Sequence, residues 1–214
     1  MPATVFTVAQ QKGGAGKTTI AAQLASAFAV MGNSVAVMDI DPQGSLTAWA
    51  GIRAQQPENK AVEITTAEVA GWRVGGEVNR LAEKHDYVVI DSPPHAETEA
   101  KIAVRSADLV IIPVQPSPTD VWATRPTVDL AESEGVPFLI VMNRVPPRSN
   151  LIGIMKKALK KQKLPIARAT IGNRVAFASS MMEGRAVVET AKSSPAAAEM
   201  RALAKEVTRK AKKK

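Results

Sequence analysis

A strand, a glycine-rich turn and a helix follow one another within residues 5–20, and this succession constrains the fold more than any other stretch. Residues 5–9, VFTVA, form a short apolar run that predicts a buried strand, and a helix with apolar periodicity opens at Lys17. The turn between them, KGGAG, can present successive backbone N–H groups to an anion, and the helix dipole adds positive potential there. Glycines let the backbone approach that anion without a Cβ in the way. The stretch therefore predicts a phosphate-binding loop.

Individual residues of this loop have distinct expected roles. Lys17 can reach the β- and γ-phosphates of a nucleotide, and the hydroxyl of Thr18 is placed to ligate Mg²⁺. The backbone of the turn would hold the remaining phosphate oxygens. The candidate cofactor-binding residues of the loop are therefore Gly13, Gly14, Ala15, Gly16, Lys17, Thr18 and Thr19.

The loop departs from the common G-x-x-x-x-G-K-[ST] pattern, because Gln11 stands where the first glycine would be and Lys12 follows it. KGGAGKTT resembles the deviant Walker A motif of the ParA/MinD family of ATPases. The resemblance implies ATP and Mg²⁺ as cofactors and a homodimer that forms on ATP. It also implies that Lys12 reaches across the dimer interface to the partner's nucleotide, and both Lys12 and Lys17 are candidate catalytic residues.

Further apolar runs indicate how the rest of the chain is organised. Residues 34–40, SVAVMDI, are almost continuously apolar, which is typical of a strand buried inside a parallel sheet. A strand–helix–strand unit with a phosphate loop predicts a doubly wound, mostly parallel α/β sheet with helices on both faces, the P-loop NTPase fold. Further strands are predicted for five segments: 61–65, 86–91, 108–116, 138–143 and 164–169. At 214 residues the chain suits a single domain, 1–214, with helices expected at 75–83 and 149–163 among others.

Carboxylates stand at the ends of two predicted strands. Asp39 and Asp41 occur in DIDPQGS, and Asp91 ends DYVVID, which is the Walker B pattern. Because the carboxyl ends of parallel strands meet at the edge of the sheet where ligands bind, we expect all three carboxylates near the phosphate and Mg²⁺ site. DIDPQGS and the following DSPP are similar to the switch I and switch II segments of the family. By that resemblance Asp41 orients the attacking water, and Asp39 supports the Mg²⁺ shell.

Three more segments bear on the interpretation. IIPVQPSPTDVWA, residues 111–123, matches small ParA proteins of the ParF-like group. IGNRVAFA, residues 171–178, resembles a family segment, but Ser179-Ser180 stands in this chain where the family has an acidic residue and alanine. Asn143 ends a predicted strand and, like the corresponding asparagine of the family, could hydrogen-bond the adenine edge; the alternative is that it satisfies a loop backbone. His85 is expected to be structural and His95 to be an exposed surface residue.

Charge is distributed unevenly along the chain. Residues 1–150 carry 12 Lys and Arg against 16 Asp and Glu, whereas residues 151–214 carry 16 against 4, so the net charge of +8 comes from a basic C-terminal region. Such asymmetry predicts a polyanionic partner, either nucleic acid or anionic lipid, although a basic surface can also be merely solvated. The candidate DNA-binding residues, besides the basic tail, are Lys156, Lys157, Lys160, Lys161, Lys163, Arg168 and Arg174.

Composition narrows the classes of protein. The absence of cysteine fits a reducing cytosol and excludes a thiolate-held iron–sulfur cluster. No run of 18 apolar residues exists, and the first strand begins too early for a signal peptide, so we expect a cytoplasmic location. The lack of an N-terminal extension makes operator-specific repression an unfavoured role.

These observations predict an ATPase switch that dimerises on ATP, binds nonspecific DNA on the nucleoid, and positions or segregates a cargo. A ParB-like adaptor protein would stimulate hydrolysis. Three alternatives stay open. A MinD-like membrane ATPase would need more apolar area than Met200, Leu203 and Val207 offer in residues 195–214, and a dethiobiotin-synthetase type enzyme would have no use for the basic tail. A tyrosine kinase related to this family would be expected to carry a cluster of tyrosines, whereas this chain has one tyrosine, Tyr87.

Overall fold

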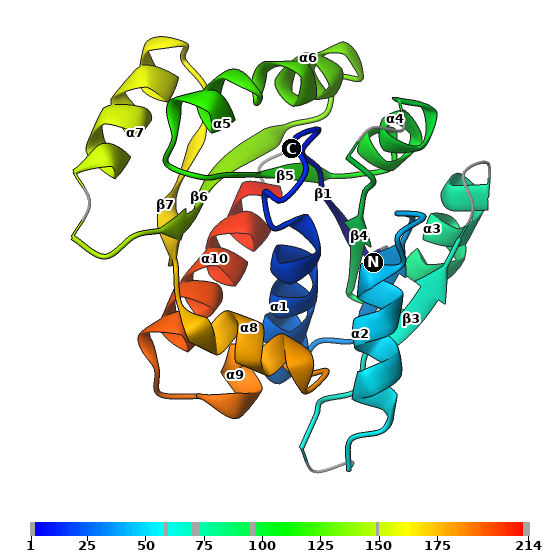
Figure 1. Ribbon diagram of the computed structural model, residues 1–214. Helices are drawn as coiled ribbons and strands as arrows, with labels where there is room; N and C mark the ends of the chain where they lie inside the picture. Colours follow the sequence, from blue (N-terminus) through cyan, green and yellow to red (C-terminus); the bar gives the residue numbers. More distant parts are fainter. Residues whose placement is uncertain (1–2, 58–59, 70–72, 95–96, 149, 212–214) are drawn as a thin grey trace.

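In the computed structural model, which describes residues 3–57, 60–69, 73–94, 97–148 and 150–211, a parallel sheet lies between two layers of helices (Figure 1). Among those residues the sheet has seven strands in the order β3-β2-β4-β1-β5-β6-β7. Every neighbouring pair is parallel. The strands are β1 (Thr4–Val8), β2 (Val35–Asp39), β3 (Thr65–Glu68), β4 (Tyr87–Asp91), β5 (Leu109–Val114), β6 (Phe138–Val145) and β7 (Ile166–Gly172).

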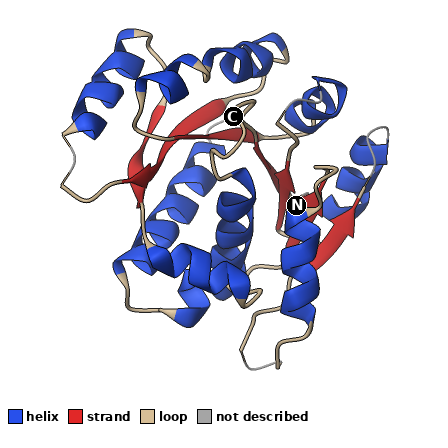
Figure 2. Cartoon of the chain, viewed as in Figure 1, coloured by secondary structure: helices blue, strands red, loops and turns tan. Residues whose placement is uncertain are grey.

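Helices cover both faces of this sheet, as Figure 2 shows. One layer contains α1 (Lys17–Val30), α2 (Ser45–Ala54), α8 (Val175–Met182), α9 (Val187–Thr190) and α10 (Pro195–Ala211). The other contains α3 (Val74–Ala82), α4 (Glu97–Arg105), α5 (Pro118–Trp122), α6 (Arg125–Ser133) and α7 (Leu151–Lys161). The predicted doubly wound α/β fold is therefore confirmed. No helix in the described part of the chain is long and apolar enough to span a bilayer.

The central strands are apolar on both sides because each side packs against a helical layer. β5 is buried over its whole length, and so is β2. Between the sheet and α1, the ring of Phe6 stacks on Phe28 with centroids 5.3 Å apart, and Phe28 stacks on Tyr87 at 4.2 Å. This packing explains why the continuous apolar runs of the sequence correctly predicted strands.

Two edge strands differ from their predicted positions. The predicted position of a strand at residues 61–65 is wrong, because β3 begins only at Thr65. The segment before β3 is held instead by the buried ion pair of Arg53 and Glu189. Glu189 accepts the N–H of Val62 at 2.8 Å, and Arg53 donates to the carbonyl of Val62 at 2.5 Å. At the other edge, β7 begins at Ile166 rather than residue 164, because the N–H of Leu164 still bonds to the last turn of α7.

The outer side of β7 is closed by two carboxylates of α10. Glu206 accepts the backbone N–H groups of Arg168 and Ala169, both at 2.9 Å, and Glu199 accepts that of Gly172 at 3.0 Å. Unpaired N–H groups at a sheet edge would otherwise be available to another strand. This edge of the sheet is therefore satisfied from within the chain.

The two histidines have different outcomes. His85 bonds through Nδ1 to the carbonyl of Leu81 at 2.9 Å and through Nε2 to the hydroxyl of Thr65 at 2.8 Å, which fits its predicted structural role. His95 lies outside the described residues.

Candidate nucleotide-binding site

In the loop between β1 and α1, residues 12–17, the N–H of Lys12 bonds to Oε1 of Gln10 at 3.4 Å, and the following backbone N–H groups have no partner among the described residues. Gly14 and Gly16 have φ values of 75° and 90°, in the left-handed region that favours glycine. Helix α1 has no side-chain cap, and no described residue accepts a hydrogen bond from the N–H groups of residues 13–18. Free N–H groups at a helix N-terminus form an anion-binding concavity. This phosphate loop, residues 12–17, therefore has the geometry that its sequence predicted.

Side chains from two neighbouring strands hold the carbonyl groups of the same loop. Gln115, just beyond β5, donates to the carbonyl of Gly14 at 3.1 Å, and Arg144 donates to it at 3.2 Å. Asn143 donates to the carbonyl of Ala15 at 2.8 Å. Because the carbonyls are turned toward these donors, the loop is braced before any anion binds.

A hydroxyl and a carboxylate meet at the start of α1. The Oγ1 atom of Thr18 donates to Oδ2 of Asp91 at 2.6 Å. The other oxygen of Asp91, Oδ1, is buried and has no hydrogen-bond partner among the described residues. Burial, with a smaller contribution from the charge of Asp39, raises the pKa of Asp91 to about 7. A buried carboxylate with one open oxygen beside a hydroxyl fits a hard divalent cation such as Mg²⁺, so Thr18 and Asp91 are the residues that would hold it.

The other two carboxylates lie in the loop after β2. Asp39, which is paired in register with Asp91, accepts the N–H of Asp41 at 3.1 Å and the N–H of Thr47 at 2.8 Å. It therefore fixes the entrance to α2. Asp41 is half-buried, and one of its oxygens accepts the N–H of Gln43 at 3.0 Å. The second oxygen of Asp41 accepts no hydrogen bond from a described residue, so this carboxylate is the more available of the two.

Lys17 is buried, and its ammonium group interacts with the charges of Asp91 and Asp41. Its burial lowers the pKa of the ammonium group, and the charges of Asp91 and Asp41 partly oppose that effect. Burial of an ammonium group costs free energy because water is lost, and hydrogen bonds to the oxygens of a polyphosphate can offset that cost.

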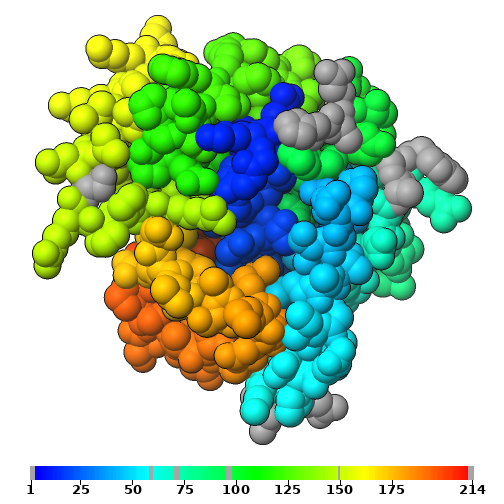
Figure 3. Space-filling view, viewed as in Figure 1, coloured from blue at the N-terminus to red at the C-terminus, as the bar shows by residue number. Residues whose placement is uncertain are grey.

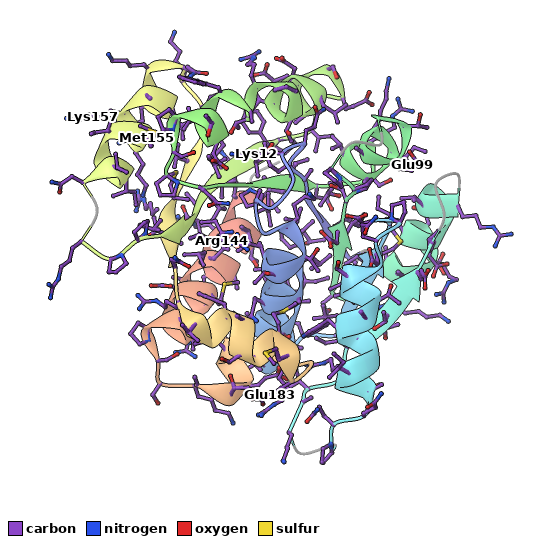
Figure 4. The ribbon with its side chains drawn as sticks, in the orientation of Figure 1. Lys12, Glu99, Arg144, Met155, Lys157 and Glu183 are labelled. Atoms are coloured by element: carbon purple, nitrogen blue, oxygen red, sulfur yellow. The ribbon has the colours of Figure 1, made fainter. Side chains whose placement is uncertain are left out.

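The second lysine of the loop, Lys12, is paired within its own chain. Its Nζ atom lies 2.6 Å from Oδ2 of Asp120 on α5, and the same oxygen accepts the hydroxyl of Ser117, the N-cap of that helix. A second link joins α6 to the loop, because Thr127 accepts the N–H of Gln11 at 3.1 Å. Figure 4 shows Lys12 and Arg144 near the N-terminal end of α1. The α5–α6 pair thus holds the strand side of the phosphate loop.

A cavity of about 190 Å³ adjoins the loop on the side of β7 and α8. It is lined among others by Thr19, Asn143 and the buried ring of Phe177. Asn143 is itself buried: its Nδ2 bonds to the loop and its Oδ1 accepts the N–H of Arg144 at 2.9 Å. Each end of the amide retains one unused position, so its predicted contact with an adenine edge stays a prediction.

The predicted DNA-binding residues lie around α7 and β7. Figure 3 shows α7, in yellow, at the periphery of the molecule, and Figure 4 shows Lys157 pointing outward from it. Lys156 is only half-exposed, and burial next to Lys160 lowers the pKa of its ammonium group. Arg174 is exposed but ion-paired with Glu199 at 2.6 Å. The remaining predicted residues are exposed: Lys157, Lys160, Lys161, Lys163 and Arg168. The last three tail lysines, residues 212–214, lie outside the described residues.

Several residues of this site were not singled out from the sequence. They are Gln115, Asp120, Thr127, Arg144 and Phe177. Gln115 and Arg144 follow or end parallel strands, and a polar residue at that position is the signal that could have found them. Asp120 and Thr127 act through contacts that span more than 100 positions of sequence, for which no local pattern exists.

Comparison with known proteins identifies similar chains. A family model described as the CobQ/CobB/MinD/ParA nucleotide binding domain matches residues 6–188. The maintenance of carboxysome distribution protein A of Halothiobacillus neapolitanus is 27% identical over 193 residues, which cover 87% of this chain and 88% of that protein. The chromosome-partitioning ATPase Soj of Thermus thermophilus is 28% identical over 244 residues, covering 94% and 93%.

A solved structure shares the fold. The septum site-determining protein MinD of Pyrococcus horikoshii, in complex with Mg-ADP, superposes with a TM-score of 0.74 over 96% of each chain at 22% identity.

Proposed function

The chain belongs to the CobQ/CobB/MinD/ParA family of nucleotide-binding domains, and from this premise we propose that it is a Mg²⁺-dependent ATPase working as a positioning switch. ATP closes two copies into a homodimer, the dimer binds DNA without sequence preference, and hydrolysis returns it to monomers. The observation that carries the proposal is the combination of free loop N–H groups with the Thr18–Asp91 contact, next to which Lys17 is buried.

Binding of ATP would use groups that are already positioned. The N–H groups of the phosphate loop and Lys17 hold the β- and γ-phosphates, and Asn143 faces the base from the adjoining cavity. Thr18 and Asp91 hold Mg²⁺, with Asp39 supporting the arrangement through the loop backbone. The metal supplies positive charge that offsets the charge of the phosphate oxygens.

Hydrolysis would depend on two further residues. Asp41 orients the attacking water, which its half-exposed position and its open oxygen support. Lys12 neutralises charge on the partner's phosphates, and for this it must leave Asp120. A cationic group supplied in trans is worth about 10³–10⁵ in rate in comparable NTPases. Hydrolysis therefore stays slow without the dimer and without a stimulating partner.

The basic C-terminal region would bind the phosphate backbone of DNA. The exposed lysines of α7 and Lys163 form a cationic surface with few aromatic side chains, so phosphate contacts dominate over base stacking. The dimer would double this surface. Nucleoid association in the cytoplasm follows from the same argument.

The cargo would be held by an adaptor protein that stimulates hydrolysis, in the manner of a ParB-like partner. One relative bears a name that concerns carboxysome distribution and another a name that concerns chromosome partitioning. Both are positioning tasks, which supports the class of function without naming the cargo of this chain.

Multi-angle light scattering with ATP and Mg²⁺ tests the switch. Wild-type protein is expected to shift from monomer to dimer and to hydrolyse ATP slowly. Lys12→Gln should keep ATP binding, because Lys17 and the loop backbone remain, but should lose the dimer and the hydrolysis that depends on it. Lys84→Gln, at an exposed lysine remote from the loop, is the matched control.

Three results would count against the proposal. Wild-type protein that binds no ATP would remove its basis. A Lys12→Gln variant that dimerises and hydrolyses normally would make Lys12 an ordinary surface lysine. Binding of the ATP form to anionic vesicles, with none to DNA, would assign the basic region to a membrane instead.

A further inference from the structure

A groove of about 570 Å³ runs between α2 and the segment that leads into β3. Small side chains of α2, Ala50 and Ala54, line one side, and Ile64 and Thr66 line the other. Figure 1 shows β3 beside α2 at the end of the sheet. None of the residues that line this groove belongs to the candidate nucleotide site.

The strand that borders the groove has an open edge. β3 is the last strand of the sheet among the described residues. The N–H of Val69 donates to the carbonyl of Asp39 on β2 at 3.3 Å, and bonding alternates along a parallel strand. The backbone groups of Thr66 and Glu68 therefore point away from β2, and no described residue pairs with them on that side.

The opposite edge of the sheet is not open in this way. There Glu206 and Glu199 accept the outward N–H groups of β7. One edge is satisfied from within the chain, whereas the other is left unpaired beside a groove. An open edge strand next to a helix is the arrangement that takes up an extended peptide as an additional strand.

The charge of the surroundings indicates the kind of peptide. Glu63, which lines the groove, and Glu68 on β3 are both exposed. Among the described residues that line the groove, Arg53 is the one cation, and it is buried and paired with Glu189 at 2.7 Å, so it offers no net positive charge. Residues 1–150 as a whole carry a net charge of −4. The groove therefore complements a basic peptide.

We propose that β3 and α2 form a docking site for an extended basic segment of another protein, which pairs with the free edge of β3 and places apolar side chains against Ala50, Ala54 and Ile64. The backbone supplies the hydrogen bonds and the groove selects apolar residues at alternate positions of the segment. Glu63 lines the groove and Glu68 lies on the same face of β3 as Thr66, so they select Lys or Arg at groove-facing positions that flank the apolar ones. This site goes beyond the proposed ATPase cycle and does not depend on it.

The experiment titrates nucleotide-free protein into the fluorescein-labelled peptide Lys-Thr-Val-Thr-Val-Thr-Arg-Thr, in which alternate residues carry the apolar and basic side chains on one face, and follows anisotropy. Saturable binding is expected. The same peptide with Glu in place of Lys and Arg should bind at least tenfold more weakly. A version with alternate amides N-methylated, which cannot pair with a strand, should bind at least tenfold more weakly as well. Bound peptide should slow hydrogen exchange at the amides of Thr66 and Glu68.

Variants of the protein test the same contacts from the other side. Ala54→Trp fills the groove from an exposed position, and Thr66→Pro removes an outward N–H that β2 does not use. Each should weaken the peptide at least tenfold. Glu63→Lys should weaken it about fivefold, whereas Glu83→Lys, at an exposed glutamate after α3, should have no effect. Unchanged ATP affinity in each variant shows that the fold is intact.

Three results would overturn the proposal. Equal affinity for the acidic and basic peptides would remove the charge argument. Undiminished binding to Thr66→Pro or to the N-methylated peptide would exclude strand addition. A mass in light scattering, without nucleotide, that falls from dimer to monomer in Thr66→Pro would assign the edge to a second copy of the chain.

Discussion

The ammonium group of Lys12 lies 2.6 Å from the carboxylate of Asp120, so the lysine that the proposed dimer needs is bound to α5 of its own chain. A side chain cannot hold this carboxylate and a partner's phosphate at once. Formation of the dimer must therefore break the pair, and the strength of the pair sets part of the cost of dimerisation.

The first prediction concerns that pair. Asp120→Asn should strengthen ATP-dependent dimerisation by up to about 25-fold, because a partly exposed ion pair contributes about 1 kcal/mol at most, about fivefold, and one such pair is broken in each copy. The dimer dissociation constant, measured by light scattering across a dilution series, checks this. Asp129→Asn, at a surface pair with Arg125, is the control and should change nothing. Weaker dimerisation in Asp120→Asn would mean that Asp120 instead holds Lys12 in its productive position.

The second prediction concerns Asp41. Asp41→Ala should bind ATP and dimerise normally but lose hydrolysis about 10²–10⁴-fold, which is the usual contribution of a group that positions or activates a nucleophile. Phosphate release under saturating ATP measures the rate. Gln43→Ala keeps the backbone N–H that bonds to Asp41 and should retain activity. A normal rate in Asp41→Ala would remove this residue from the mechanism.

The third prediction follows from the raised pKa of Asp91. Its carboxyl group titrates near 3.8 in an unfolded chain and at about 7 in the native state, so the folded protein holds the proton more tightly. The contribution of Asp91 to the free energy of unfolding is therefore fully present below about pH 4 and is lost as the pH rises to about 7. The difference of about three pH units corresponds to at most about 4 kcal/mol. Without nucleotide and metal, the melting temperature should fall between pH 5 and pH 8.

Asp91→Asn is the comparison for this pH dependence. The variant cannot ionise at that position, so its melting temperature should fall less over the same interval. Mg²⁺ binds the ionised carboxylate, so wild-type affinity for Mg²⁺ should rise through pH 7. Parallel melting curves for the two proteins would show that Asp91 is ionised throughout.

The fourth prediction concerns DNA. Binding of the ATP form to unrelated duplexes should weaken on the order of a thousandfold between 50 and 200 mM salt if the dimer makes about six phosphate contacts. Lys160→Ala removes one lysine from each copy of the dimer, so it should reduce the slope of log affinity against log salt by about two. Arg174→Gln should reduce it less, because Glu199 already balances this guanidinium. Lys84→Ala is the control, and a salt-independent or strongly sequence-dependent affinity would contradict the model.

Local sequence patterns predicted the features that are formed by consecutive residues, such as the phosphate loop and the central strands. The phosphate loop follows from the alternation of strand, glycines and helix, and the position of Asp91 beside Thr18 follows from the rule that ligands bind beyond the carboxyl ends of parallel strands. The central strands were found because both of their sides are buried.

Contacts between distant residues could not be found in this way. Arg53 and Glu189 are 136 positions apart, and the sequence around neither residue indicates that their side chains form an ion pair. Glu189 of this pair accepts the N–H of Val62, in the segment that was predicted as a strand from residue 61, and β3 begins only at Thr65. The bounds of edge strands are the hardest to predict, because an edge strand has only one neighbouring strand to fix its register.

The carboxylates of Glu199 and Glu206 limit how many strands the sheet can gain. A sheet with two free edges is divalent, and copies of it can join end to end without limit. With these N–H groups of β7 already bonded, the proposed strand pairing gives each molecule a valence of one among the described residues, at β3. Any association of this kind stops at a pair, so the chain can combine with one strand of another molecule and still be unable to grow into a fibre.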